Sequence, residues 1–229
     1  MAQAFWDAAA PLISVTENHP FLVSMVDGTL DLENFRYYVV QDALYLTDFA
    51  DCLNRLGDKM AGVDEEVSKR LHRFAVGAEE DEKELHKSFF KKWNIDATNA
   101  EPMPNTLLYT SYMLRIVSTR PVAEGLAVLL PCCWVYMHAG KCMLELRDKL
   151  GDSVKRPAQF DAWIDMYGGE EFEREVKEYI AIVDDLVKGA DEETLKKMEE
   201  HFIMSCKLEH MFWDQANCLL RWPNFSELR

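Results

Sequence analysis

The sequence predicts an all-α protein, a bundle of roughly seven or eight helices. Apolar residues recur at helical spacing along almost the whole chain. The clearest example lies between residues 170 and 188, where one face is apolar and the opposite face carries Glu, Lys and Asp. Strand signals are nearly absent, because no Asn-Gly or Asp-Gly turn joins two alternating segments.

Each helix can be placed from its periodicity and its end signals. Asp31, Asp64 and Asp191 suit the N-cap of a following helix, because a side-chain carboxylate there accepts a backbone N–H. The pair Gly168-Gly169 marks the end of a short helix. The expected helices span about residues 32–60, 64–93, 106–118, 121–150, 156–167, 169–188 and 191–220.

The 229 residues show no internal repeat and no low-complexity linker, so we expect one domain over residues 1–229. With 25 Lys plus Arg against 40 Asp plus Glu, the formal net charge is 25 − 40 = −15. Such a surface repels phosphate backbones, which argues against nucleic-acid binding. It suits a neutral or cationic small ligand, although an acidic surface is usually only a solubility feature.

The first residues lack a basic segment followed by a long apolar one, so they do not read as a signal peptide. No apolar run approaches the roughly 20 residues that span a bilayer. The six cysteines form no Cys-x-x-Cys pair. We therefore expect reduced thiols, a cytoplasmic location and no membrane partner.

Polar residues on otherwise apolar helix faces carry the functional signal. Asp42 and Tyr45 lie three residues apart and share a face with apolar neighbours. A carboxylate in such surroundings either pairs with another helix or holds a ligand. The same alternative applies to Glu209, which shares a face with Phe212: it is a surface glutamate, or an interior proton donor with a raised pKa.

Pro131 lies inside a predicted helix, directly before Cys132. A helix proline removes one backbone hydrogen bond and kinks the helix, which opens the backbone beside the thiol and favours a thiolate. Tyr136, one turn later, lies over the same stripe, whereas the neighbouring Cys133 shares its stripe with Met137. The alternative for Cys132 is a small buried hydrophobe, which most core cysteines are.

Together these positions offer a thiol, two carboxylates and several aromatic rings on different helices. That set suits nucleophilic catalysis on a flat, electron-poor ring. Metal sites fit less well, because no histidine follows a Glu by three residues as di-iron bundles require. Glu82 and His86 could share a metal, but no second pair matches them. Phosphate loops and Gly-x-Ser-x-Gly elbows are absent from the sequence.

At these residues the sequence resembles the TenA family, the thiaminase II or aminopyrimidine aminohydrolase enzymes, over nearly the whole chain. The matching segments are His19-Pro20-Phe21, Asp27-Gly28-Thr29-Leu30, Phe35-Arg36-Tyr37-Tyr38, Gln41-Asp42, Tyr45-Leu46, Glu84-Leu85-His86, Tyr109-Thr110-Ser111, Leu129-Leu130-Pro131-Cys132, Trp134, Tyr136, Tyr167-Gly168-Gly169, Glu209 and Phe212-Trp213.

The resemblance implies a haem-oxygenase-like fold, usually a homotetramer. It implies hydrolysis of 4-amino-5-aminomethyl-2-methylpyrimidine to the hydroxymethyl pyrimidine and ammonia, with thiamin as a typical second substrate and no organic cofactor or metal. Cys132 falls at the cysteine of the Leu-Pro-Cys motif, which implies the cysteine-containing branch with Cys132 as nucleophile. By the same match, Glu209 is the acid/base on a ring nitrogen and Asp42 holds the 4-amino edge. Tyr45, Tyr109, Tyr136 and Tyr167 would line and orient the pocket.

Two positions depart from the family pattern. Cys133 stands where an aromatic residue is common, and Leu44 stands where some members have a tyrosine. These departures leave the preferred leaving group open. The alternative function is that of a catalytically silent pyrimidine-binding or regulatory protein on the same fold. A second alternative is a haem-oxygenase-like metal oxidase, but this sequence lacks the pairs of metal ligands that such an enzyme needs.

Overall fold

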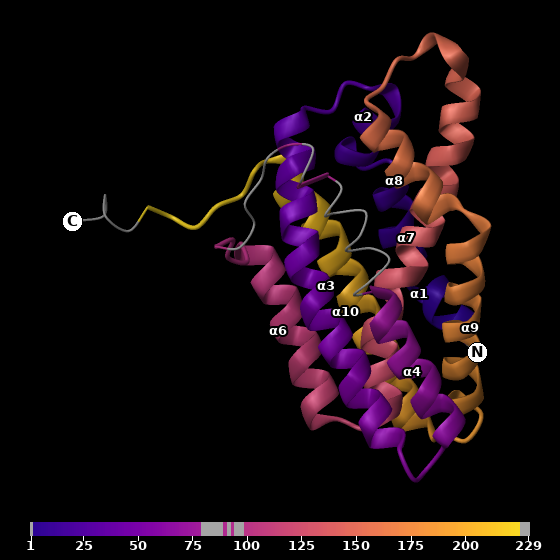
Figure 1. Ribbon diagram of the computed structural model, residues 1–229. Coiled ribbons are helices and arrows are strands. Elements are labelled where there is room, and N and C mark those ends of the chain that lie inside the picture. Colours follow the sequence, from indigo (N-terminus) through magenta and orange to yellow (C-terminus); the bar gives the residue numbers. More distant parts are fainter. Residues whose placement is uncertain (1, 79–88, 91–92, 94–98, 225–229) are drawn as a thin grey trace.

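The computed structural model describes residues 2–78, 89–90, 93 and 99–224. Figure 1 shows an elongated bundle of helices, with the last described residues leading away from it beyond the end of α10. The described helices are α1 (Ala2–Glu17), α2 (Pro20–Asp27), α3 (Leu32–Met60), α4 (Glu65–Gly77), α6 (Pro104–Thr119), α7 (Val122–Leu150), the 3₁₀ helix η2 (Gly151–Ser153), α8 (Ala158–Gly168), α9 (Glu170–Val187) and α10 (Glu192–Asn217). No strand occurs among the residues that the structure describes, so the all-α prediction is confirmed.

The predicted helices agree with the observed ones to within a few residues. The three predicted aspartate caps are present: the Asp31 side chain accepts the Glu33 N–H at 2.8 Å, Asp64 caps α4, and Asp191 accepts the Thr194 N–H at 2.8 Å. The helix predicted over residues 64–93 is described continuously only as far as residue 78. The predicted Glu82 and His86 pair lies outside the described residues.

Two N-terminal helices were not predicted. Helix α1 contains Pro11, and a proline inside a segment argues against a helix when the sequence is considered alone. Helix α2 has only eight residues and depends on its ends. The His19 ring accepts the Phe21 N–H at 3.1 Å at the start of α2, and Gly28 ends it with φ of 79°, which is the left-handed conformation that glycine adopts readily.

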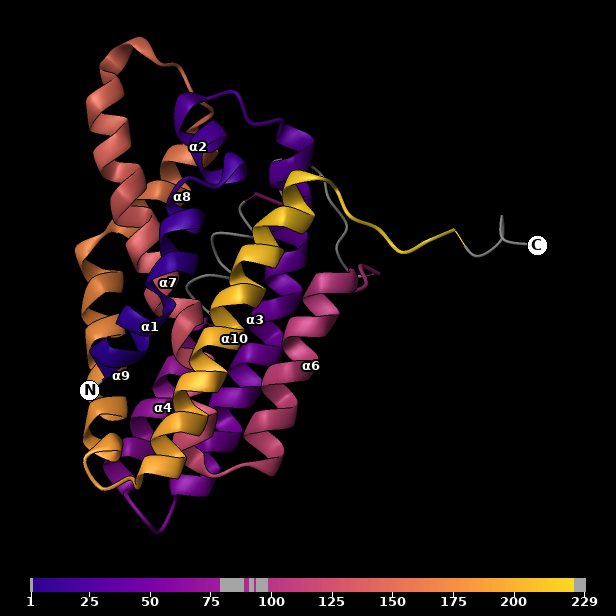
Figure 2. The same cartoon turned by 180° about the vertical axis from the view of Figure 1, so that it is seen from behind.

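Helix α7 is the centre of the bundle. It packs against α10, α8, α9, α6 and α2, and α10 also contacts α1, α3 and α6. Figures 1 and 2, seen from opposite sides, show α10 running beside α3, with α6 next to them. Helix α7 continues from Val122 to Leu150 through Pro131, so the proline does not end the helix.

Within the described residues, α7 alone is long and apolar enough to cross a membrane by composition. Its most apolar window is 72% buried inside the bundle, which is typical of the core helix of a soluble protein.

Candidate active site

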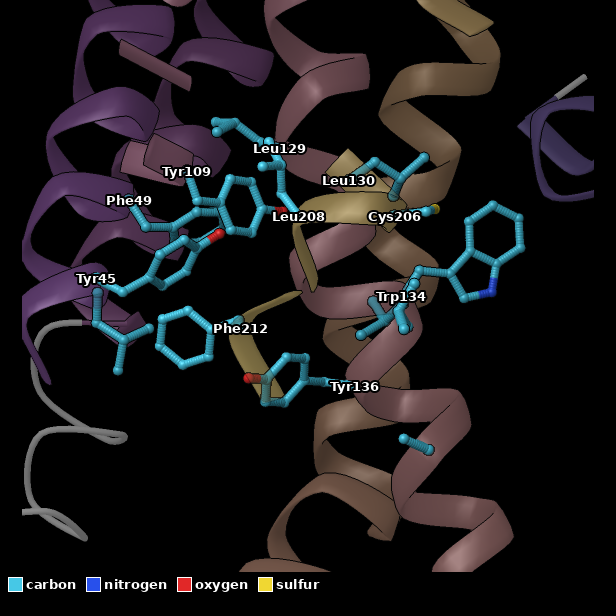
Figure 3. Packing of buried hydrophobic residues seen from close by; sticks show 14 of the residues in the cluster. Tyr45, Phe49, Tyr109, Leu129, Leu130, Trp134, Tyr136, Cys206, Leu208 and Phe212 are labelled. Carbon is cyan, nitrogen blue, oxygen red and sulfur yellow. The ribbon is translucent and has the colours of Figure 1, made fainter. Parts of the chain in front are cut away.

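The predicted site residues come from five helices and meet in one buried aromatic cluster. They are Asp42 and Tyr45 on α3, Tyr109 on α6, Cys132 and Tyr136 on α7, Tyr167 on α8, and Glu209 and Phe212 on α10. Figure 3 shows the rings of Tyr45, Tyr109 and Phe212 near one another, whereas Trp134 points away on the far side of α7. These residues are separated by up to 170 positions in the sequence, from Asp42 to Phe212, and the fold brings their side chains together.

Glu209 is an interior carboxylic acid. Its side chain is 2% exposed, and the Tyr109 hydroxyl donates a hydrogen bond to Glu209 Oε1 at 2.6 Å. Burial raises the pKa of Glu209 to about 8; the hydrogen bond from Tyr109 opposes this shift and the negative charge of Asp42 adds to it. Glu209 is therefore protonated near neutral pH, which is the state a general acid needs.

Cys132 lies at the edge of this cluster, half-buried on α7. The Tyr45 hydroxyl forms a hydrogen bond with the Cys132 side chain, and burial raises the pKa of Tyr45 well above its usual value. The ring of Tyr45 lies 4.9 Å from that of Tyr109. The thiol and Glu209 are thus connected through two neighbouring tyrosines from α3 and α6.

Asp42 is 97% buried and lies in a second polar group that reaches the same cluster. The Tyr38 hydroxyl is 3.4 Å from Asp42 Oδ2 and 3.3 Å from the Tyr136 hydroxyl. The Trp163 indole N–H donates to the Tyr38 oxygen at 3.1 Å. Tyr38 therefore joins Asp42 to α7 and α8. In the sequence, Tyr38 stands only within a segment that matches the family, and no pattern there assigns a role to Tyr38 or Trp163.

The remaining aromatic residues close the cluster. The Tyr136 and Tyr167 rings meet edge to face at 5.0 Å, and the Phe212 ring meets Tyr45 edge to face at 5.6 Å. Each of these four side chains is at most 5% exposed. Such rings provide flat apolar surfaces and hydroxyl groups around a planar ligand.

The adjacent Cys133 faces elsewhere. Its thiol donates to the Leu130 carbonyl oxygen at 3.3 Å, within α7. Cys133 lines an apolar cavity of about 70 Å³, together with Phe49 from α3 and Phe172 and Tyr179 from α9. The predicted division between the two cysteines therefore agrees with the geometry: Cys132 contacts Tyr45, and Cys133 packs towards α9.

Cys206, one turn before Glu209 on α10, is a third thiol near the cluster. It is 97% buried, and burial together with the charge of Glu209 raises its pKa far above the usual value. A thiol in this state is a poor nucleophile. The arrangement as a whole offers one half-buried thiol, one protonated carboxylic acid and one buried carboxylate around a set of aromatic faces.

Comparison with known proteins gives consistent results. A family model described as the TENA/THI-4/PQQC family matches residues 6–219. The chain is similar to the aminopyrimidine aminohydrolase of Bacillus subtilis (strain 168), with 36% identity over 201 residues that make up 86% of this chain and 81% of that protein.

Solved structures show the same fold. A TenA homologue from P. horikoshii OT3 superposes with a TM-score of 0.83 at 25% identity, over 94% of this chain and 97% of the homologue. A domain of unknown function with a haem-oxygenase-like fold, from Shewanella denitrificans OS217, superposes with a TM-score of 0.71 at 14% identity, over 94% and 89% of the two chains. The haem-oxygenase-like fold implied by the sequence is therefore confirmed.

Proposed function

The chain belongs to the TENA/THI-4/PQQC family, and on that basis we propose that it is an aminopyrimidine aminohydrolase of thiamin salvage. It hydrolyses 4-amino-5-aminomethyl-2-methylpyrimidine to the 5-hydroxymethyl compound and ammonia. The curated relative from Bacillus subtilis carries the name of this activity. The structural observation that supports the proposal is the buried acid Glu209, with a pKa of about 8, in one cluster with Cys132.

The reaction needs a way to expel a poor leaving group. Direct displacement at the methylene carbon is slow because amines leave badly. In the proposed mechanism the Cys132 thiolate adds to a ring carbon, and the aminomethyl group, in its ammonium form, then leaves as ammonia. Water adds to the resulting exocyclic methylene and gives up a proton to solvent. The ring regains its aromaticity as the bond to Cys132 breaks and the ring nitrogen returns its proton to Glu209. Two easier steps replace one difficult step.

Glu209 and Asp42 have complementary roles in this mechanism. Protonated Glu209 donates its proton to a ring nitrogen as the thiolate adds, so negative charge does not build up on the ring. Asp42, held by Tyr38, accepts a hydrogen bond from the 4-amino group of the pyrimidine. Two buried carboxyl groups in one site, of which Glu209 is protonated near neutral pH, suit a ligand that both accepts and donates hydrogen bonds.

The aromatic side chains would position the pyrimidine. Tyr45, Tyr109, Tyr136, Tyr167 and Phe212 surround the two carboxyl groups with ring faces and edges. Stacking on these rings orients the flat substrate with its methylene group towards the thiol. Thiamin is a second candidate substrate. Leu44 and Cys133 replace family aromatics, so the comparison of the two substrates decides which leaving group is preferred.

The mechanism needs no organic cofactor or metal, because the ring itself accepts the electrons of the incoming thiolate. We further propose that the chain works in the cytoplasm as a homo-oligomer, by analogy with the tetramers of its family. The net charge of −15 is consistent with a small-molecule substrate, and it argues against a nucleic-acid partner because an acidic surface repels phosphate backbones.

The test is steady-state release of ammonia from the aminopyrimidine, compared with release of thiazole from thiamin. We expect a higher kcat/KM for the aminopyrimidine. Glu209→Gln keeps the shape of the side chain and should lower kcat by roughly 10²- to 10⁴-fold, as loss of one general acid does. Tight pyrimidine binding without turnover would instead support the silent binding protein, and normal turnover by Glu209→Gln would make Glu209 structural.

A further inference from the structure

Outside the aromatic cluster, three metal-ligating side chains of different chemistry meet on the other side of α7. Glu17 is the last residue of α1, and His138 and Cys142 lie one turn apart on α7. Glu17 Oε1 is 2.7 Å from His138 Nε2, and Cys142 Sγ is 3.6 Å from the same nitrogen. One ligand atom from each residue lies within 4.8 Å of the others.

These separations fit a tetrahedral metal ion. With Zn–N and Zn–O bonds of about 2.0–2.1 Å and a Zn–S bond of about 2.3 Å, tetrahedral geometry places nitrogen and sulfur about 3.6 Å apart. It places nitrogen and oxygen about 3.3 Å apart. The His138–Cys142 distance already has the first value. Glu17 has to withdraw by only about 0.6 Å to reach the second, and its side chain is 35% exposed and so has room to rotate.

The surroundings of His138 also favour metal binding through its Nε2 atom. Among the described residues, the hydrogen-bond partners of His138 are all at Nε2. The proton can therefore move to Nδ1 when Nε2 binds a metal. The Trp6 ring packs edge-on against the imidazole at 5.2 Å and stacks on Trp134 at 4.6 Å, so the ring is held in one orientation.

A second cluster also brings three candidate ligand atoms within 4.8 Å of one another, from His19, His210 and Asp214. The position of the ring proton on His19 argues against metal binding there. The Phe21 N–H donates to His19 Nδ1, so the ring proton must be on Nε2, where it points at Asp214 Oδ1. A metal at Nε2 would force that proton onto Nδ1, against the Phe21 N–H. His19 therefore serves as the cap of α2 rather than as a ligand.

From this geometry we infer that Glu17, His138 and Cys142 form a binding site for Zn²⁺ or a similar thiophilic divalent cation. Cys142 binds as the thiolate and releases its proton to solvent, and water completes the fourth position. The ion ties the end of α1 to the middle of α7. Cys142 lies ten residues beyond Cys132, about 15 Å along the helix axis, so the ion stabilises the fold and takes no part in turnover.

The test uses the full chain, stripped with a chelator and titrated with Zn²⁺ by calorimetry or with Co²⁺ by absorption. Co²⁺ bound to a thiolate gives a charge-transfer band in the near ultraviolet. We expect one site per chain, with this band present in the wild type and absent in Cys142→Ser. His138→Gln should weaken binding by more than the roughly 10- to 100-fold that loss of an outer-shell partner causes.

Two matched variants serve as controls. Cys218→Ser removes an exposed thiol, and His210→Gln removes a member of the rejected cluster; both should keep full binding. Zn²⁺ should raise the melting temperature of the wild type but not that of Cys142→Ser. Metal-free wild type and Cys142→Ser should turn over substrate equally. Absence of binding at micromolar metal, or a charge-transfer band that survives in Cys142→Ser, would overturn the proposal.

Discussion

Two adjacent residues on α7 show how the environment of a side chain decides its chemistry. Cys132 contacts Tyr45 beside the acid Glu209, while Cys133 donates to the carbonyl of Leu130 and borders an apolar cavity. Successive helical residues point about 100° apart, so the two thiols cannot both face one cluster. The pair therefore separates the proposed chemical role of Cys132 from the packing role of Cys133 at nearly the same place in the chain.

The first prediction concerns this pair. Cys132→Ser should nearly abolish turnover, because a hydroxyl is far less nucleophilic than a thiolate at neutral pH. Cys133→Ser should keep most of the activity, since its thiol lies against α9. In the wild type, iodoacetamide should inactivate the enzyme, and a bound pyrimidine should protect Cys132 in peptide maps. An inactive Cys133→Ser with an active Cys132→Ser would reverse the assignment, and activity in both would exclude cysteine catalysis.

The second prediction assigns Tyr38 as a positioning residue. Its hydroxyl accepts from Trp163 and lies next to Asp42 and Tyr136, so removing it leaves Asp42 less well held. A hydrogen bond to a charged group contributes about 1.5–3 kcal/mol. Tyr38→Phe should therefore raise KM about 10-fold or more, with a smaller change in kcat.

Tyr37→Phe is the matched control for Tyr38→Phe, because the Tyr37 hydroxyl bonds to the Leu220 carbonyl outside the cluster. It should leave both kinetic constants near wild type. Equal effects of the two substitutions would show that Tyr38 only supports the fold.

At the residue scale, the titratable groups of the candidate site are visible in the sequence, but their partners are not. A carboxylate or a thiol on an apolar helix face is visible in the sequence, as Asp42, Cys132 and Glu209 were. Trp163 is 125 positions from Tyr38 and bonds to it only because α8 packs beside α3 and α7. A tyrosine in an apolar stripe looks the same with or without such a partner.

At the element scale, periodicity located the long helices well and failed at the ends. Helix α8 begins at Ala158, two residues later than predicted, and α10 ends at Asn217 rather than near residue 220. Helix α1 was missed because its proline breaks the pattern and its stability comes from packing on α10 and α7. Tertiary contacts of this kind leave little trace in a single segment.

The third prediction concerns the close contact of α7 with the end of α8. A Cβ atom added at Gly140 would lie 2.4 Å from the backbone carbon of Tyr167, so the two helices must separate to admit it. Gly140→Ala should lower the free energy of unfolding by about 1–3 kcal/mol and raise KM, because Tyr167 moves with the helix. Chemical denaturation and steady-state kinetics measure the two effects.

Gly189→Ala is the control at this scale, since an added Cβ there meets no atom within 4 Å. It should be close to neutral in stability and kinetics. If Gly140→Ala were also neutral, the approach of α7 to Tyr167 would have no part in shaping the site.

At the scale of the whole molecule, Glu209 links the site to global stability. Burial raises the pKa of Glu209 from 4.5 to about 8 in the folded chain, so the folded state binds more protons than the unfolded state between these pH values. Stability contributed by the protonated carboxyl is present below about pH 4.5 and is lost as the pH rises through about 8. At 1.36 kcal/mol per pKa unit, the change is on the order of 5 kcal/mol.

The fourth prediction therefore concerns unfolding by urea between about pH 5 and pH 9. The free energy of unfolding of the wild type should fall as the pH rises, whereas that of Glu209→Gln should fall less, because glutamine cannot ionise in the buried site. The variant should thus be the more stable protein above about pH 8, although it is the less active one. Glu171→Gln, whose side chain is 89% exposed, should follow the wild type throughout. Parallel curves for Glu209→Gln and the wild type would mean that Glu209 ionises normally, and the protonated acid required for catalysis would have to be another group.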